Sequence, residues 1–445
     1  MRDFAVSDDP RVQAQLDRLG TLSLPQGRIG IETIGALLER LGDPQRRLPP
    51  VFHIAGTNGK GSTCAFLRAA LEAAGHKVHT FTSPHLVRFN ERIRIAGKLI
   101  DDEALAALLA EVLDAAEAAG IAASFFEIST AVAFLTFAHS PADACVIEVG
   151  LGGRFDATNV LESPAVCGIA SLGIDHEAFL LAAEEGAPSA PFSRIAFEKA
   201  GIAKRGVPLV TLDYTPAMNE TIADQAARAG GPLVRQGREW SLHPQTEGFI
   251  YRDARGEVAL PAPGLPGAHQ ISNAGLAVAM LRHQDAIQMS EAALASAVSS
   301  THWPARLQPL REGPLTALLP SRAPCWLDGG HNPDAGRALA SHFSASNAPI
   351  HLIIGMLANK NPAALLAPLE GRLASVTAVP VPGHPSHDVA AFAQVSDKVR
   401  PGAAANVAEA LRRLPINPDA GEIVLIAGSL YLAGEVLRLN QQIPD

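Results

Sequence analysis

Short apolar runs alternate with longer helical patterns along most of this chain. The apolar runs that predict buried strands in the first part are Val51–Ala55, Lys77–Phe81, Ala144–Val149, Ala165–Ala170 and Val207–Thr211. Helices are predicted between them, with the most regular patterns at Thr63–Ala74, Glu103–Ala119 and Ser129–Ala138. Such alternation is typical of a mostly parallel sheet covered by helices on both faces.

The alternation restarts after a break at Ser299–Arg306. The second part predicts strands at Cys325–Leu327, Ile350–Ile354, Val376–Val379 and Ile423–Ile426, and helices at Ala335–Phe343, Ala363–Leu373 and Ala404–Leu414. We therefore expect two α/β domains, residues 1–305 and 306–445. Two such domains suit an enzyme that brings two substrates together.

Composition narrows the class of protein. The chain has 445 residues, of which 47% are hydrophobic and 18% charged, which excludes a disordered chain. The formal net charge of −9 gives no general attraction for nucleic acid or anionic lipid, so we expect neither as a partner. Any bound anion must be held by a local arrangement of groups.

The cysteines and the apolar stretches indicate a cytoplasmic protein. Cys64, Cys145, Cys167 and Cys325 lie far apart without a C-x-x-C pair, so we interpret them as reduced core thiols. Acidic residues occur at the N-terminus where a signal peptide needs an apolar run. The longest uncharged stretch contains three prolines and several polar residues, so we expect no membrane span.

The strongest local motif is the sequence HIAGTNGKGST at residues 53–63. Its glycines join a predicted strand to a helix expected to begin near Ser62, so that backbone N–H groups can approach phosphate oxygens. Lys60 adds a positive charge for the β- and γ-phosphates, and a hydroxyl group here can reach Mg²⁺. The loop differs from G-x-x-x-x-G-K-[ST], because Gly61 separates Lys60 from Ser62.

A second glycine-rich stretch follows the predicted strand at residues 144–149. Glu148 stands at the carboxyl end of that strand, where parallel sheets bind ligands and where a carboxylate can bind Mg²⁺. A buried acid paired with an arginine is the alternative interpretation. The glycines at residues 150–153 suggest a dinucleotide fingerprint, but Phe155 stands where its third glycine belongs, which argues against a nicotinamide dehydrogenase.

The loop sequence GTNGKGST resembles that of the Mur ligase superfamily, and specifically that of folylpolyglutamate synthases and dihydrofolate synthases. Further stretches resemble this family in the same order along the chain: Thr82–Ile93, Ile147–Asn159, Gly173–His176, Glu198–Ile202, Trp303–Arg306, Leu327–Pro333, Gly355–Leu357 and Gly428–Leu430. The resemblance implies an N-terminal P-loop-type ATPase domain with a mostly parallel sheet and a smaller, Rossmann-like C-terminal domain.

The resemblance also implies a set of site residues. ATP would be bound by Gly56, Thr57, Asn58, Gly59, Lys60, Gly61, Ser62, Asn273, Arg306 and Asp328. Two Mg²⁺ sites would involve Ser83, Glu148 and His176. Lys199 resembles the family lysine that CO₂ carbamylates, and Lys60, Glu148, His176, Lys199 and His331 would be catalytic. The pterin would lie beside Phe125, Phe126, Glu127, Phe155, Asp156 and Ala157.

The implied reaction is ATP-dependent addition of L-glutamate to dihydropteroate, to reduced folates or to both, through an acyl phosphate, by a monomer. Two departures from the family pattern stand out: Gly330 occupies an alanine position, and residues 25–32 do not match the pterin-binding segment. A monofunctional folylpolyglutamate synthase is the alternative within the class. Another Mur-type ligase, a P-loop kinase and a nucleotide-regulated binding protein are the more distant alternatives.

Overall fold

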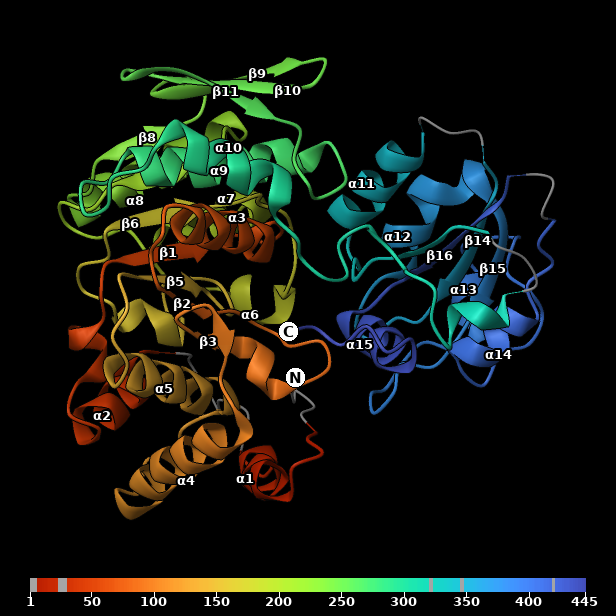
Figure 1. Cartoon of the computed structure of the whole chain (residues 1–445), viewed down its shortest axis with the longest axis horizontal. Helices are drawn as coiled ribbons and strands as arrows, with labels where there is room; N and C mark the ends of the chain where they lie inside the picture. The colour runs from red at the N-terminus through yellow and green to blue at the C-terminus, as the bar shows by residue number, and fades with distance from the viewer. Residues whose placement is uncertain (1–5, 23–29, 320–322, 345–347, 418–420) are drawn as a thin grey trace. The chain divides into compact units, whose positions relative to one another are not determined.

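The computed structural model describes residues 6–22, 30–319, 323–344, 348–417 and 421–445, so most of the segment 25–32 lies outside the described residues. The chain forms two compact units (Figure 1). The first comprises Met1–Gly264 and Gln270–His302, and the second comprises Leu265–His269 and Trp303–Asp445. The short segment Leu265–His269 thus belongs to the second unit, although it precedes the domain boundary expected near Arg306.

A large mixed sheet forms the centre of the first unit. Its strands, in the order in which they pair, are β4 (Lys98–Leu99), β3 (Ile93–Ile95), β2 (Val78–Phe81), β5 (Ala144–Glu148), β1 (Val51–Ala55), β6 (Val166–Ile169), β7 (Leu209–Thr211) and β8 (Leu233–Arg235). All neighbours from β2 to β8 are parallel, whereas β3 and β4 add an antiparallel edge. The five predicted strands are confirmed with small shifts at their ends.

The helices of the first unit are α1 (Pro10–Gly20), α2 (Glu32–Arg40), α3 (Lys60–Ala73), α4 (Asp102–Ala118), α5 (Phe125–Ala138), α6 (Glu177–Leu180), α7 (Pro191–Ala200), α8 (Pro216–Ala229), α9 (His269–Arg282) and α10 (Glu291–Ser300), with α9 beginning in the segment that joins the second unit. Short 3₁₀ turns occur at η1 (Pro44–Arg47), η2 (Phe89–Arg92) and η3 (Ala157–Val160). Helix α5 begins before the predicted Ser129 because Ser124 and Glu127 form a capping box at its start.

The two faces of the large sheet are covered by different helices. On one face, α1, α2, α4 and α5 share a core with β2 and β5, and α7 and α8 share a second core with β1, β6 and β7. The opposite face packs closely against α9, since a Cβ atom at Gly168 on β6 would lie 2.3 Å from the Met280 sulfur. The expected arrangement of helices on both faces is thus confirmed.

A separate antiparallel sheet of β9 (Trp240–Gln245), β10 (Gly248–Asp253) and β11 (Gly256–Pro261) also belongs to the first unit (Figure 1). The predicted alternation did not include it, because its half-buried strands mix polar and apolar residues and lack long apolar runs. Asp253 connects this sheet to α9: its fully buried side chain accepts two hydrogen bonds from Arg282, at 2.7 Å each.

The second unit contains a five-stranded sheet that is parallel except at one edge. In pairing order its strands are β12 (Gln308–Pro309), β13 (Cys325–Leu327), β16 (Ile423–Ala427), β14 (Ile350–Ile354) and β15 (Leu373–Ala378). Its helices are α11 (Pro333–Phe343), α12 (Pro362–Leu369), α13 (Val389–Ala393), α14 (Val407–Arg412) and α15 (Leu430–Leu439), with 3₁₀ turns η4 (Thr316–Leu318) and η5 (Glu370–Arg372).

Two helices of the second unit are shorter than predicted. Helix α12 ends at Leu369, after Pro368 in its last turn, and Leu373 already begins β15. Helix α14 begins at Val407, because the Asn406 side chain caps it by accepting the Glu409 N–H at 2.9 Å.

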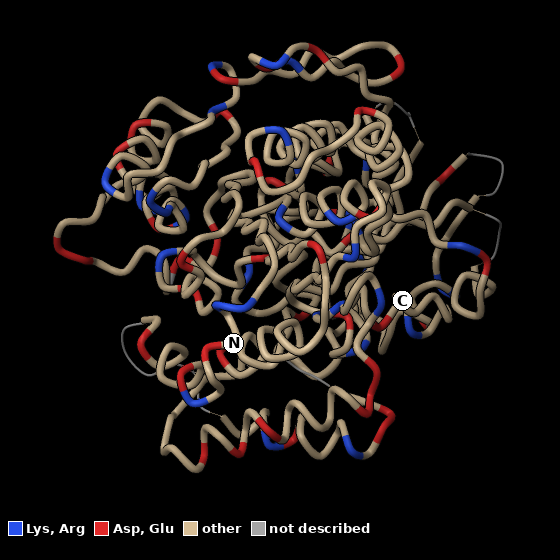
Figure 2. Tube along the Cα trace, turned by 60° about the vertical axis from the view of Figure 1, so that its left-hand side comes forward, with Lys and Arg blue, Asp and Glu red and all other residues tan. Residues whose placement is uncertain are grey.

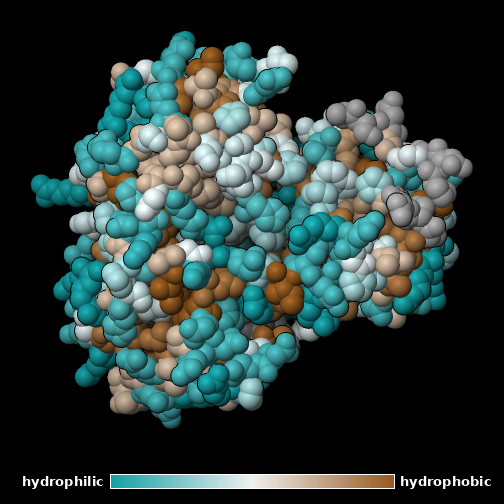
Figure 3. Space-filling model, in the orientation of Figure 1, coloured by the Kyte–Doolittle hydropathy of each residue, from teal (hydrophilic) through white to brown (hydrophobic). Residues whose placement is uncertain are grey.

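The surface charges and the buried cysteines agree with what the composition predicts. Lys and Arg are interspersed with Asp and Glu along the trace (Figure 2), and hydrophilic residues dominate the face seen in Figure 3. All four cysteines are free and buried, as predicted. Among the described residues, none of the helices has both the length and the apolar character needed to cross a membrane.

Gly330 lies in a tightly packed part of the second unit, next to Asp328. The Asp328 carboxylate accepts the N–H groups of Leu307 at 2.8 Å and Gly330 at 2.7 Å. A Cβ atom at Gly330 would lie 2.6 Å from the Ala335 Cβ and 2.7 Å from an Asp328 oxygen. Gly330, at a position where the family has alanine, therefore leaves room for the close approach of α11.

We expect Gly330→Ala to lower the free energy of unfolding of the second unit by about 1–3 kcal/mol, because neither Ala335 nor the bonded Asp328 carboxylate can move aside cheaply. Chemical denaturation followed by circular dichroism measures this change. Gly371→Ala is the matched control, since nothing lies within 4 Å of its added Cβ. Equal stability of the two variants would contradict the packing argument.

Candidate active site

The loop between β1 and α3 has the geometry of a phosphate-binding turn. Gly56 and Gly59 adopt positive φ angles of 153° and 84°, which strongly favour glycine. The loop is fastened to the end of β6, because the Thr57 N–H donates to the Ser171 carbonyl at 2.8 Å and its hydroxyl donates to the Gly173 carbonyl at 2.8 Å. These two hydrogen bonds therefore hold the backbone of the loop in place.

Helix α3 begins at Lys60, two residues before the predicted start. Its N-cap residue is Gly59, and no described side chain caps the first turn. The first N–H groups of a helix have no partner within the helix, and together with the helix dipole they favour an anion. The start of α3 thus meets the requirement for binding a phosphate group.

Lys60 and Glu148 form the charged centre of this site. The Lys60 Nζ lies 3.9 Å from the Glu148 Oε1, and both side chains are largely buried. The other Glu148 oxygen accepts the Ser83 N–H at 3.1 Å. Three predicted residues from three different segments therefore meet at the carboxyl ends of β1, β2 and β5.

Lys199 is buried on α7 beside the same centre, with 4% of its surface exposed. Its ammonium group donates to the Gly152 carbonyl at 3.4 Å. Burial, assisted by the nearby positive charge of Lys60, lowers the pKa of Lys199 to about 7, and the negative charges of Asp156, Asp175 and Glu198 partly oppose this shift. A substantial fraction of this lysine is thus neutral at physiological pH.

Asn273 on α9 lies against the phosphate loop. Its side-chain oxygen would lie 2.3 Å from a Cβ atom at Gly59, and its amide donates to Gln270 Oε1 at 2.9 Å. The structure therefore brings Asn273 to the loop between β1 and α3 from a distant part of the sequence.

Asp156 organises the loop that follows β5. Its carboxylate accepts the N–H groups of Leu151 at 2.8 Å and Thr158 at 3.0 Å, and the Thr158 hydroxyl at 2.5 Å. Burial raises the pKa of Asp156, which these hydrogen bonds oppose. The neighbouring Ala157 is buried, and the Phe155 ring lies under the Arg154 guanidinium at 4.1 Å.

Phe125, Phe126 and Glu127 share the first turn of α5. The Phe126 ring lies against Gly150, where an added Cβ would lie 2.3 Å from the ring. Phe125 packs edge-on against Phe89, with ring centroids 6.1 Å apart. The Glu127 carboxylate accepts both the N–H and the hydroxyl of Ser124, at 2.8 and 2.7 Å, so it already serves the helix cap. The S-x-x-E spacing was the sequence signal for this role.

His176 is exposed and adopts φ 54° at the N-cap of α6. Within the described residues, no group of three or more His, Cys, Asp and Glu side chains is arranged to bind a metal ion. The metal roles of Ser83, Glu148 and His176 stay predictions.

Thr63, in the first turn of α3, was not selected from the sequence. Its buried hydroxyl oxygen has no hydrogen-bond partner among the described residues. A hydroxyl oxygen without a partner, three residues after Lys60, and the Glu148 carboxylate are both oxygen donors of the kind that Mg²⁺ prefers. By chemical type, these donors fit this ion. Both hydroxyls of the GKGST string were visible in the sequence, but only the fold shows which one is buried without a partner.

The remaining predicted residues lie in the second unit. Arg306 stands between Ala305 and Leu307, which both adopt positive φ angles, of 56° and 44°. Asp328 connects this turn to Gly330 by the two hydrogen bonds given above. His331 shares a hydrogen bond with the Gly329 carbonyl at 3.1 Å, and Asn332 caps α11 by accepting the Ala335 N–H at 3.0 Å. These residues thus cluster at the carboxyl end of β13.

Comparison with known proteins gives a consistent result. Residues 315–439 match the family model described as the C-terminal domain of dihydrofolate synthetase. The chain is 33% identical to a folylpolyglutamate synthase of Lacticaseibacillus casei, over 90% of this chain and 92% of the relative. It is also 33% identical to a dihydrofolate synthase/folylpolyglutamate synthase of Bacillus subtilis, over 92% and 94%.

Solved structures agree with these relatives. Escherichia coli FolC in complex with DHPP and ADP superposes with a TM-score of 0.84 at 31% identity, covering 96% of this chain and 97% of that one. A bifunctional folylpolyglutamate synthase/dihydrofolate synthase with Mn, AMPPNP and L-glutamate bound superposes with a TM-score of 0.82 at 29% identity, covering 98% and 99%. The fold predicted from the sequence is therefore confirmed, and the chain belongs to the folylpolyglutamate synthase/dihydrofolate synthase family of the Mur ligase superfamily.

Proposed function

We propose that the protein is an ATP-dependent ligase that adds L-glutamate to dihydropteroate and to reduced folates. The observation that carries this proposal is the meeting of Lys60, Glu148 and Lys199 at the phosphate loop of a chain that belongs to this family. The relatives bind ADP, DHPP, AMPPNP, Mn and L-glutamate, as their structures record, which supports a nucleotide, a divalent metal ion and these substrates here.

The chemistry explains why such charges are needed. A carboxylate is a poor electrophile at neutral pH, and phosphorylation by ATP converts it to an acyl phosphate that an amine can attack. The glutamate amine then displaces phosphate, and an amide, ADP and inorganic phosphate result. Catalysis of phosphoryl transfer depends on positioning and on neutralising charge.

The residues of the first unit have separate tasks in this proposal. The glycine loop and the start of α3 bind the phosphates through backbone N–H groups, and Lys60 neutralises charge on the transferred group. Ser83, Glu148 and His176 would hold Mg²⁺, which when bound supplies additional positive charge to the phosphate oxygens. The loop around Phe155, Asp156 and Ala157 and the start of α5 would hold the pterin.

The second unit carries its own set of proposed site residues. Arg306 would contact the ATP phosphates and Asp328 the ribose, while His331 would act at the glutamate and acyl-phosphate end. Asp328 accepts two backbone N–H groups, and a carboxylate can accept further hydrogen bonds of the kind that a ribose hydroxyl donates. We propose residues 1–305 as the ATP-binding part and 306–445 as the glutamate-ligase part.

The function is tested by measuring ADP release with dihydropteroate, tetrahydrofolate or neither, each with and without L-glutamate. We expect release only when a pterin substrate and glutamate are both present, with either pterin. Glutamate-dependent release with tetrahydrofolate but not with dihydropteroate would indicate a monofunctional folylpolyglutamate synthase. Release of a phosphorylated product without glutamate would indicate a kinase, and no release under any condition would remove the proposal.

Lys60→Ala should leave the fold intact and lower glutamate-dependent ADP release by roughly 10²–10³-fold, because the transferred phosphate loses its neutralising charge. Circular dichroism and steady-state kinetics check the two parts of this prediction. Lys98→Ala is the control, since Lys98 is exposed on β4. Wild-type activity in a folded Lys60 variant would exclude the phosphate role.

Lys199 should form a carbamate with dissolved CO₂, because only a neutral amine attacks CO₂ and the pKa of Lys199 is about 7. At a fixed pressure of ¹³CO₂, lowering the pH through 7 protonates the amine and should remove the carbamate signal in ¹³C NMR. Lys199→Arg should lack the signal at every pH, whereas Lys204→Arg should keep it. A signal that is unchanged in Lys199→Arg would contradict the assignment.

A further inference from the structure

The segment that joins His176 to Lys199 contains charged residues outside the roles assigned above. It runs through α6, a loop at residues 181–190, and α7. Glu184 lies in that loop with one quarter of its side chain exposed, whereas the side chains of Arg194 and Glu198 on α7 are 7% and 6% exposed. The loop therefore places one partly exposed carboxylate against buried charges.

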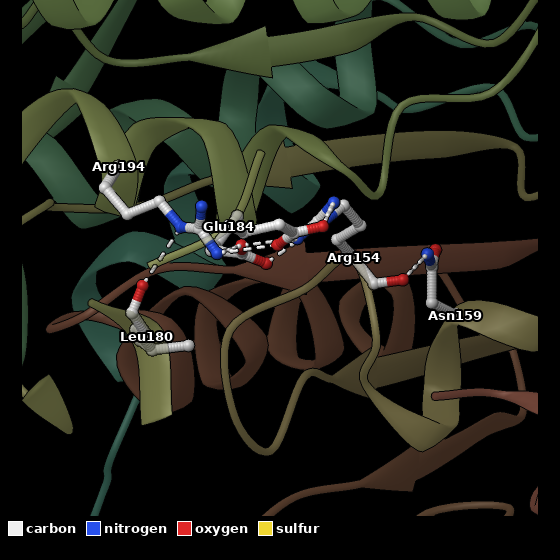
Figure 4. Close-up of polar contacts among 6 residues, drawn as sticks. Arg154, Asn159, Leu180, Glu184 and Arg194 are labelled. Carbon is white, nitrogen blue, oxygen red and sulfur yellow. Dashed lines mark hydrogen bonds and ion pairs between the residues drawn. The ribbon is translucent and has the colours of Figure 1, made fainter. Parts of the chain in front are cut away.

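Glu184 bridges two guanidinium groups (Figure 4). Arg154 donates to both of its oxygens, to Oε1 at 3.1 Å and also to Oε2. Arg194 donates to Oε2 from the other side, at 2.8 Å. Such paired contacts with guanidinium groups are both directional and strong.

The two arginines are themselves firmly placed. Glu198 accepts from Arg154 at 2.8 Å and lies 3.0 Å from an Arg194 nitrogen. The Arg154 guanidinium also lies over the Phe155 and Phe197 rings, at 4.1 and 4.7 Å from their centres. The loop is thus attached to a rigid support rather than to mobile surface side chains.

The charges of this group balance only when Glu184 is present. Arg154 and Arg194 carry two positive charges, and Glu198 alone supplies one negative charge. The hydrogen bond from Arg154 lowers the pKa of Glu184 to about 2, so Glu184 is ionised at neutral pH. If the Glu184 charge is removed, two largely buried guanidinium groups share the single carboxylate of Glu198. One positive charge is then uncompensated, which destabilises this arrangement.

The attached segment covers the surroundings of Lys199. The Arg194 Nε donates to the Leu180 carbonyl at 3.2 Å, and a Cβ atom at Gly152 would lie 3.0 Å from the Leu180 Cδ2. Gly152 is the residue whose carbonyl accepts the Lys199 ammonium. A chain of contacts therefore runs from Glu184 through Arg194 and Leu180 to the immediate environment of Lys199.

We propose that Glu184 is a positioning residue whose ion pairs with Arg154 and Arg194 keep the 176–190 segment closed over Lys199. Its consequence for catalysis rests on the proposed function, because it matters only if Lys199 serves the ligase reaction. A closed segment excludes water from Lys199, and exclusion of solvent protons slows the acid-driven loss of a carbamate. Local opening of the segment would expose the amine.

Access to Lys199 can be measured with cyanate, a small reagent that carbamoylates neutral amines irreversibly. The labelling is run without CO₂ at pH 9, well above the pKa of about 7, so that the rate reports access and not protonation. The rate at the Lys199 peptide is read by mass spectrometry against Lys98, which is exposed in every variant.

Glu184→Gln should raise the labelling rate at Lys199 by about fivefold or more, as expected for the loss of an ion pair worth about 1 kcal/mol. Glu185→Gln is the matched control. It removes the same charge from the neighbouring, exposed residue, and the described residues give Glu185 no ion pair. Glu184→Asp keeps the charge on a shorter side chain, so its labelling rate at Lys199 should lie between the rates of the wild type and Glu184→Gln. This variant also keeps the test usable if Glu184→Gln is insoluble.

Equal labelling of Glu184→Gln and the wild type, or equal acceleration by Glu185→Gln, would overturn the proposal. In the ligase assay, Glu184→Gln should lower kcat more than it changes KM for ATP, and a higher CO₂ pressure should restore part of the loss. A lower kcat in Glu184→Gln without any change in the labelling rate at Lys199 would also contradict the proposal. If the wild type shows no ligase activity while labelling still depends on Glu184, the proposed function fails and the closed segment stands.

Discussion

Burial of opposite charges at the carboxyl ends of β1 and β5 is the constraint on which the rest of the first unit depends. Lys60, Glu148, Asp156 and Lys199 all lie in surroundings that disfavour charge, and each is stabilised by specific partners. Removing one partner from such a set leaves an uncompensated charge, which is costly. The N–H of Ser83 and the loop after β5 meet this requirement, because they donate hydrogen bonds to the carboxylates of Glu148 and Asp156.

This arrangement also prepares the site before any ligand arrives. The backbone of the phosphate loop is fixed by Thr57, and Asp156 fixes the neighbouring loop through Leu151 and Thr158. Little reorganisation is then needed when charge develops on a phosphate group, which is the main benefit of a preorganised polar site. The low pKa of Lys199 follows from the same burial and does not require a special catalytic partner.

The central strands could be predicted because they are buried on both faces and read as unbroken apolar runs. The antiparallel strands β9 to β11 could not, since polar residues interrupt their buried positions and their attachment through Asp253 and Arg282 is a long-range contact. In the site, the phosphate loop was visible as a local motif. The approach of Asn273 to Gly59 and the orphaned Thr63 hydroxyl depend on tertiary packing, and the cap role of Glu127 was present in the spacing but was assigned to the pterin instead.

The turn around Arg306 has a consequence for how this sequence can vary. Ala305 and Leu307 adopt left-handed backbone angles that cost energy for residues with a Cβ atom, and Asp328 and Gln308 accept the N–H groups that keep them there. A β-branched residue at either position would raise this cost, whereas glycine would remove it and give the unfolded chain more freedom. Few residues can therefore replace Ala305 and Leu307 on the two sides of Arg306. The residues present accept some backbone strain, and in return this connection has one defined backbone conformation.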